Sequence, residues 1–276
     1  MSATSETEAV DSVCAFAQGD ILSFSEEIND GTGVSFGIVI NADCDLENKK
    51  NDGVISYLPT YTLRSYLNKF WGPKHITSLS NDILRQIQQT CKLSNNEISD
   101  LLAWVQDESP DSIATKLIER LNLKKSTADS LSMWLERLDI LLSDKEPLQK
   151  ISSVYRNDDD GHRQVIKQIS AGRQSIGDGS FFISEIYGQA TLGYVIRLSR
   201  ILSLPMDLCF SDKAKRLSSG LDDRSAIRVG RLTPTYKYRI AQLFSNQYSR
   251  IGLPNELMAL SEIAIDELAT ALRLGR

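Results

Sequence analysis

Helix start signals recur through residues 76–146, and they constrain the fold more than any other feature of the chain. Ser94 opens an S-x-x-E capping box, in which the serine and the glutamate cap each other's backbone N–H groups. Ser109 is followed by proline, which suits the first position of a helix. The four expected N-cap residues are Ser80, Ser94, Ser109 and Ser126. We therefore expect four consecutive helices here.

A weak internal repeat with an offset of 30 residues runs through the same stretch. The matching pairs are Leu93 and Leu123, Leu101 and Leu131, Trp104 and Trp134, and Val105 and Leu135. Two related helix hairpins would explain this spacing. The two tryptophans would then occupy equivalent packing positions, since buried aromatic side chains more often fill a core than bind a ligand.

The segment before this stretch has the pattern of β-strands. AQGDILSFS, VSFGIVINADCDL and VISYLPTY are separated by NDGTG and NKKNDG, whose Asn, Asp and Gly residues favour turns. SFGIVI is almost continuously apolar, which is typical of a strand buried on both faces. TLRSYLNKFWG is expected to form a short helix that Gly72-Pro73 ends.

Residues after Pro147 have a mixed pattern. ISSVYRNDDDGHR predicts a strand and a turn, and HRQVIKQISAG predicts a short helix ending at Gly172. IGDGSFFISEIYG and IRVGRLTP are expected to be strands, whereas LGYVIRLSRILSLP fits a strand or a helix. A firm helix should begin after Thr233, with Pro234 in its first turn, and an amphipathic helix should follow it.

These patterns predict an α+β protein with a small β-barrel that a four-helix insertion interrupts. The expected parts are a disordered tail (1–13), the first half of the barrel (14–75), the helical insertion (76–146), the second half of the barrel with short helices (147–232), and C-terminal helices (233–276).

Composition excludes several classes of protein and site. No apolar run reaches the roughly 18 residues that a membrane-spanning helix needs, so no membrane partner is expected. The four cysteines are scattered without a CxxC pair, which fits a reducing cytoplasm. Two histidines are too few for a His-rich metal site, and no nucleotide-binding fingerprint occurs. We expect no metal and no cofactor.

Charge is unevenly distributed along the chain. Residues 151–250 carry 15 Lys and Arg against 9 Asp and Glu, whereas residues 1–75 carry 5 against 11. A basic block of this kind can bind phosphate groups. It can equally pack against the acidic N-terminal part of the same chain, and charge asymmetry does not distinguish the two.

The most unusual short motif is Asp43-Cys44-Asp45, at the expected end of the buried strand. Two flanking carboxylates raise the pKa of a thiol, so Cys44 is a poor nucleophile. On an extended strand the two aspartates would point the same way and could hold Mg²⁺, but no third ligand is placed by spacing. The simpler interpretation is that Asp45 caps the loop and Cys44 packs as a small apolar residue.

The helix after Thr233 and the residues before it form the most basic local feature. Its candidate binding residues are Arg228, Arg231, Lys237, Arg239, Gln242 and Arg250, together with Cys44 and Asp45 at the strand end. These side chains could contact a nucleic-acid backbone. A solvated helix face with internal ion pairs is at least as common.

Residues 110–142 also have the pattern of a helix-turn-helix unit. Lys124, Lys125, Ser126 and Thr127 would lie at the start of its second helix, where phosphate is favoured. Against DNA binding, residues 76–150 carry 9 Lys and Arg against 12 Asp and Glu, and no wing follows.

Three stretches have a familiar pattern: QGDIL, the strand end GIVINADCDLEN and the segment RLTPTYKYRIAQLFSNQYSRIGLP. They resemble a group of bacterial and phage-encoded proteins of unknown function, whose barrel is similar to the SH3-like barrel of PemK/MazF-type toxins. The matching residues are Gln18, Gly19, Asp20, Ile21, Cys44, Asp45, Pro234, Tyr236, Gln242, Arg250, Gly252, Leu253 and Pro254. They cover about 60 residues at the two ends of the chain.

The resemblance implies an SH3-like barrel and a toxin or phage-defence setting. Such toxins cleave RNA without metal through an Arg and a Thr or Ser, yet this chain has no arginine before Arg64. We therefore favour a non-catalytic adaptor that binds a protein from the same operon, RNA or DNA. The alternatives are a ribonuclease using Asp45 and Arg250, and a DNA-binding regulator using residues 110–142.

Overall fold

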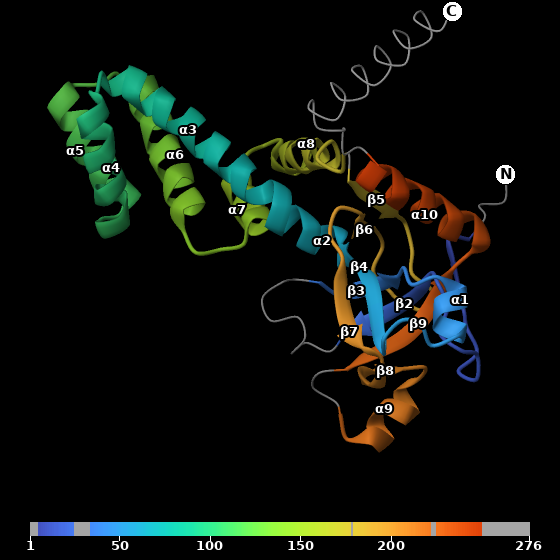
Figure 1. The fold of residues 1–276 in the computed structure, drawn as a ribbon. Helices are drawn as coiled ribbons and strands as arrows, with labels where there is room; N and C mark the ends of the chain where they lie inside the picture. Colours follow the sequence, from blue (N-terminus) through green and yellow to red (C-terminus); the bar gives the residue numbers. More distant parts are fainter. Residues whose placement is uncertain (1–4, 25–33, 178, 222–224, 250–276) are drawn as a thin grey trace, which may run out of the picture.

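The computed structural model describes residues 5–24, 34–177, 179–221 and 225–249. Its architecture is α+β, as the sequence predicted, and the sheet is a curled, largely antiparallel half-barrel. Figure 1 shows helices against this sheet and a helical arm that extends away from it.

Nine strands form one sheet within the described residues. They are β1 (Thr7–Glu8), β2 (Asp20–Phe24), β3 (Phe36–Val39), β4 (Val54–Thr62), β5 (Ser180–Ile183), β6 (Tyr194–Arg197), β7 (Leu202–Pro205), β8 (Cys209–Phe210) and β9 (Ala226–Leu232). The order is β1-β9-β2-β3-β4-β6-β5, with β7 on β4 and β8 on β9. Only the β8–β9 pair is parallel among these strands. Strands distant in sequence are therefore neighbours.

The two faces of the sheet bury separate apolar cores, because side chains alternate along each strand. One core contains Tyr57 and Tyr61 of β4 and is covered by the helical segment that follows β4. The other contains Ile38 and Leu58 and is covered by α10 (Pro234–Ser249). Glycine is required at position 37 in the first core, since a Cβ there would lie 2.5 Å from the Tyr57 ring.

The helices between β4 and β5 follow each other closely. They are α2 (Leu63–Tyr66), the π-helical turn η1 (Leu67–Trp71), α3 (Gly72–Cys91), α4 (Asn95–Asp107), α5 (Pro110–Leu121), α6 (Lys125–Leu142), α7 (Pro147–Val154) and α8 (Gly161–Arg173). Three short elements lie elsewhere, namely α1 (Asp43–Glu47), the 3-10 turn η2 (Met206–Leu208) and α9 (Lys213–Ser219). The arm in Figure 1 consists of α3 to α6.

Local cap signals predicted two of the arm's helix starts correctly. Ser94 and Glu97 form the capping box of α4, and Ser109 caps α5 with proline at its first position. The expected caps Ser80 and Ser126 are wrong. Ser80 lies in the middle of α3, and α6 begins at Lys125 with no side-chain cap.

The 30-residue repeat corresponds to a real packing repeat in the arm. Leu101 and Leu131 are both buried in the arm's core, and Trp104 and Trp134 both pack against it half-buried. The turn residues Lys92 and Asn122, also 30 apart, both adopt positive φ at a helix end. Each turn ends one helix and starts the next in the same way.

Gly72-Pro73 does not end a helix, contrary to the expectation. The chain continues from α2 through η1 into α3, because proline is tolerated at the start of a helix and the π-helical turn precedes it. Gly72 has a packing role instead: a Cβ there would lie 2.4 Å from the Pro147 side chain. The glycine at position 72 therefore allows close contact with α7 and does not mark a helix end.

Other expectations also differ from the structure. The predicted strand after Pro147 is the helix α7, whose apolar residues Ile151 and Val154 pack against α3 and α6. The buried strand ends at Val39, well before Asp43. Residues 5–13, for which we expected disorder, include β1, in which Thr7 is buried beside Leu232 of β9. The predicted final helix lies outside the described residues.

Candidate functional site

The motif Asp43-Cys44-Asp45 lies in α1, a single helical turn, rather than on an extended strand. The expected arrangement, in which two aspartates point the same way, is therefore wrong, because residues i and i+2 diverge on a helix. Cys44 is exposed, and its Sγ lies 3.6 Å from Oδ1 of Asp45. Within the described residues, no group of three His, Cys, Asp or Glu side chains could hold a metal ion.

Asp43 has a structural role at this position. Its Oδ1 accepts a hydrogen bond from the backbone N–H of Gln18 at 2.7 Å, and its Oδ2 lies 3.1 Å from Nζ of Lys237. Burial raises the pKa of Asp43. The hydrogen bonds from Gln18 and Lys237 and the charges of Lys237 and Arg231 lower it by more, so the net shift is downward. Asp43 therefore fastens α1 to α10.

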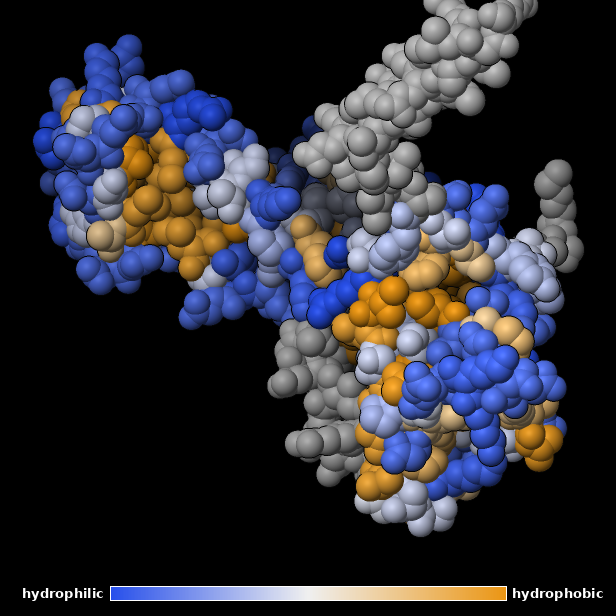
Figure 2. Space-filling model, viewed as in Figure 1, coloured by the Kyte–Doolittle hydropathy of each residue, from blue (hydrophilic) through white to orange (hydrophobic). Residues whose placement is uncertain are grey.

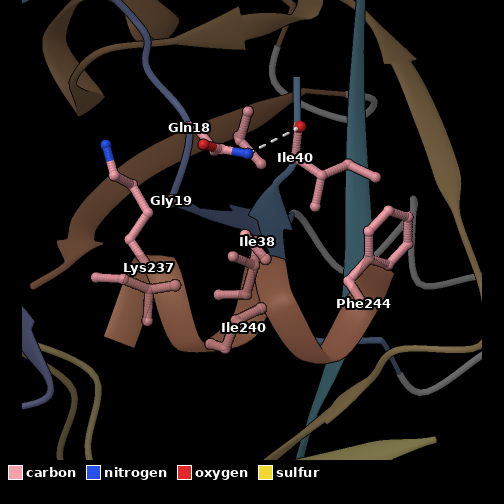
Figure 3. Close-up of a pocket in the computed structure, with 10 residues that line it drawn as sticks. Gln18, Gly19, Ile38, Ile40, Lys237, Ile240 and Phe244 are labelled. Atoms are coloured by element: carbon pink, nitrogen blue, oxygen red, sulfur yellow. Dashed lines mark hydrogen bonds between the residues drawn. The ribbon is translucent and has the colours of Figure 1, made fainter. Parts of the chain in front are cut away.

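A small cavity of about 150 Å³ lies beside this contact, between α10 and the strands β2 and β3. Figure 3 shows Lys237, Ile240 and Phe244 of α10 facing Ile38 and Ile40, with the Gln18 side chain bonded to the carbonyl of Ile40. Its polar groups already have partners in the chain. It offers a ligand little room.

Asp20 and Arg228 form the most deeply buried ion pair among the described residues. Their side chains are 0% and 1% exposed, and Nη1 of Arg228 lies 3.2 Å from Oδ2 of Asp20. Arg231 adds a second contact, from Nε to Oδ1 at 2.6 Å. That hydrogen bond with Asp20 raises the pKa of Arg231. We call these three residues the buried ion network.

Arg228 also holds the N-terminal segment in place. Its guanidinium donates hydrogen bonds to the carbonyl oxygens of Asp11, Cys14 and Ala15, each at 2.9 Å. These contacts explain why the segment before β2 is ordered, and they leave the terminal guanidinium nitrogens directed into the protein. The structure thus places two predicted binding residues, Arg228 and Arg231, in internal ion pairs.

The remaining predicted site residues are dispersed. Arg239 lies over the ring of Phe181, with Cζ 5.8 Å from its centroid, and Gln242 is exposed on α10. Arg250 lies outside the described residues, so its expected pairing with Asp45 stays a prediction. Asp45 itself is half-buried in α1.

A second group of cations lies near the ends of β4 and β6, and sequence reasoning missed it. Lys69 and Phe70 come from η1, whereas Arg197 and Arg200 come from the end of β6 and the turn after it. Cζ of Arg197 lies 4.5 Å from the centroid of the Phe70 ring. Nζ of Lys69 lies 6.0 Å from the centroid of the Tyr61 ring. We call these five residues the basic–aromatic cluster.

Electrostatic effects confirm that these cations are close together. Burial lowers the pKa of Lys69, and the charge of Arg200 lowers it further. Burial raises the pKa of the Tyr61 hydroxyl, and the charges of Arg200 and Arg197 oppose that rise. The cluster therefore brings cationic side chains close to two aromatic rings.

Tyr61 is the most unusual member of the cluster. Its side chain is fully buried, yet its hydroxyl has no hydrogen-bond partner among the described residues. A buried hydroxyl without a partner is costly, because it has lost its bonds to water.

No local motif could have revealed this cluster. Tyr61 pairs with Val195 across β4 and β6, and Arg197 lies on the same face two residues later. This register joins segments more than 130 residues apart. The one local indication of a basic–aromatic site was the pair Lys69-Phe70, and a lysine next to a phenylalanine is common in helices.

Residues 110–142, which the sequence suggested as a helix-turn-helix unit, form the two helices α5 and α6, with Lys124 at the N-cap of α6 and exposed. However, α6 packs between α3 and α5 and buries Leu131, Leu135 and Leu138. A recognition helix must project into the major groove, which this packing opposes. The cations at its start are still accessible.

The chain matches no protein-family model, and no curated protein or solved structure matches it either. None of the helices in the described part of the chain is long and apolar enough to cross a membrane.

Proposed function

We propose that this protein is a non-catalytic binding protein that holds a single-stranded nucleic acid on the basic–aromatic cluster. The observation that carries the proposal is the convergence of Lys69, Arg197 and Arg200 on Phe70 and Tyr61. Cations beside aromatic rings are the combination with which proteins bind single strands, through phosphate contacts and stacked bases.

Arg197 is suited to both kinds of contact. Its guanidinium is held on the Phe70 ring, so its other planar side can stack on a base while its N–H groups bind phosphate. Because the ring already fixes the side chain, less conformational entropy is lost on binding.

The cluster contains no carboxylate or imidazole that could act as a general base, which favours binding without cleavage. A ribonuclease of the PemK/MazF type is the alternative, and it rests on the QGDIL and RIGLP resemblance. The same resemblance supports an SH3-like barrel with a four-helix insertion, and a cytoplasmic toxin or phage-defence setting. A partner protein from the same operon also stays a proposal.

Fluorescence anisotropy with a labelled single-stranded RNA, and with DNA of the same sequence, tests the proposal. We expect salt-sensitive binding, which Arg197→Ala and Arg200→Ala together weaken about tenfold or more. Each lost phosphate contact should reduce the slope of log K against log salt by about 0.7. Equal binding by this double variant and the wild-type protein would refute the site.

Three controls separate the alternatives. Arg120→Ala removes a side chain that is 72% exposed on the arm and should leave binding unchanged. Changing Lys124 and Lys125 to Glu should also have no effect, whereas a DNA-binding regulator would lose affinity. Electrophoresis of the RNA after incubation detects cleavage, which the ribonuclease alternative requires and our proposal excludes.

A further inference from the structure

A cavity of the size that holds small molecules lies between α2, η1, α8 and β5. Its volume is about 520 Å³, which is within the range of small-molecule sites. The lining residues are Leu63, Leu67, Ile169, Ser170, Arg173, Ile176 and Phe182. Five of these seven side chains are apolar.

The walls of this cavity are fixed by close packing. A Cβ on Gly172 would lie 2.8 Å from Leu67, so the absence of a side chain lets α8 approach η1 closely. Gly193 has φ +85° and lies against Leu63 and Phe182 in the same way. The cavity is therefore a preformed space between rigid elements.

The end of α8 is tied to α2 by a further contact. The hydroxyl of Tyr66 donates a hydrogen bond to the carbonyl of Ser175 at 3.2 Å. Ser175 directly follows the last turn of α8, where Arg173 lies. This contact holds the polar end of the cavity at a constant distance from its apolar wall.

The polar groups of the cavity are few and of one kind. Arg173 and Ser170, one helical turn apart on α8, supply a guanidinium and a hydroxyl. None of the described carboxylates forms an ion pair with Arg173. A guanidinium binds a planar carboxylate through two parallel hydrogen bonds. A single cation at an apolar cavity suits a ligand with one negative charge and an apolar body.

Phe182 indicates where the apolar body would lie. Its side chain is 42% exposed although it belongs to the sheet, and it faces the cavity with Leu63 and Leu67. Covering such a ring removes apolar surface from water, which favours binding by roughly 25 cal/mol for each Å². An alkyl chain would supply that cover.

From this chemistry we propose that the cavity binds a free fatty acid of medium chain length. The alkyl chain lies among Leu63, Leu67, Ile169, Ile176 and Phe182, and the carboxylate binds Arg173 and Ser170. This site shares no residue with the basic–aromatic cluster, although Leu67 and Lys69 lie in the same turn η1.

Isothermal titration of the full chain with decanoate, below its micelle concentration, tests the proposal. We expect saturable binding and a higher melting temperature. Arg173→Ala should weaken decanoate binding about tenfold or more, and it should leave the binding of the neutral analogue decanol unchanged. Arg163→Ala is the matched control, because Arg163 is a second arginine of α8 and 82% exposed.

A second variant tests the apolar wall. Ile169→Phe fills the cavity with an apolar ring and should abolish the binding of both decanoate and decanol while the chain stays folded, as circular dichroism would show. Absence of decanoate binding to the wild-type protein would overturn the proposal. Equal losses in the Arg173 and Arg163 variants would also overturn it, and Arg197→Ala should bind decanoate normally.

Discussion

The buried ion network and the basic–aromatic cluster use the same side chain, arginine, in opposite ways. Arg228 is enclosed, and Asp20 and three backbone carbonyls accept its hydrogen bonds. Arg197 is half-buried and lies over the Phe70 ring, near other cations. The first arrangement joins an arginine to a carboxylate and to backbone carbonyls, whereas the second joins an arginine to an aromatic ring.

This difference shows that residue type and local charge density are poor guides to a binding surface. The sequence pointed to Arg228 and Arg231 because they lie in the most basic stretch of the chain. The structure pairs both with a single buried carboxylate on β2. The buried pair should therefore contribute far more to stability than pairs or cations that solvent reaches.

Asp20→Ala should have the largest effect. Removing one partner of a buried pair leaves an uncompensated charge, which typically costs 3–5 kcal/mol, so the free energy of unfolding should fall by about that amount. Urea denaturation measures the change. Asp82→Ala breaks an exposed pair with Arg85 and should change stability by less than about 0.5 kcal/mol. Similar losses of unfolding free energy in the two variants would contradict the distinction between the buried pair and the exposed pair.

Lys237→Met should have a smaller, pH-dependent effect. Lys237 lowers the pKa of Asp43, so the pair stabilises the fold above the unfolded pKa of Asp43, and this contribution is lost as pH falls through the folded pKa. Asp43 is 51% exposed, so solvent screening limits the loss to about 1 kcal/mol or less at pH 7. Denaturation at pH 7 and about pH 3 should show the difference shrinking with acid. A constant difference would contradict the pairing.

Arg200→Ala should have the smallest effect, a shift in the pKa values of neighbouring side chains, of which Lys69 is the one to measure. Arg200 lowers the pKa of Lys69, so the substitution should raise it towards the ordinary lysine value. Nuclear magnetic resonance of the lysine side chains measures this shift directly. An unchanged pKa would mean that Arg200 does not belong to the cluster. The variant's stability should stay close to that of the wild-type protein.

The arm and the cluster also differ in how far the sequence could predict them. Capping boxes and helix-end turns act within a few residues, so Ser94 and the 30-residue repeat were visible directly. The cluster depends on the register between β4 and β6, which no short motif encodes. Gly72-Pro73 was interpreted as a helix end because glycine and proline often end helices. Here the glycine is needed for close packing on Pro147 of α7 instead.

The pairing of β2 with β9 has a consequence for the order in which the protein folds. Asp20 and Arg231 are 211 residues apart, so their contact cannot form until nearly the whole chain has been synthesised. At about 5–20 residues per second, the edge of β2 that pairs with β9 waits roughly 10 to 40 seconds for its partner on the ribosome, although β3 can pair with the other edge much earlier. The arm, whose contacts are local, can fold during that time. The edge of β2 that pairs with β9 is thus among the last parts of the sheet to be paired. A chaperone that shields this edge would shorten the period in which it can aggregate.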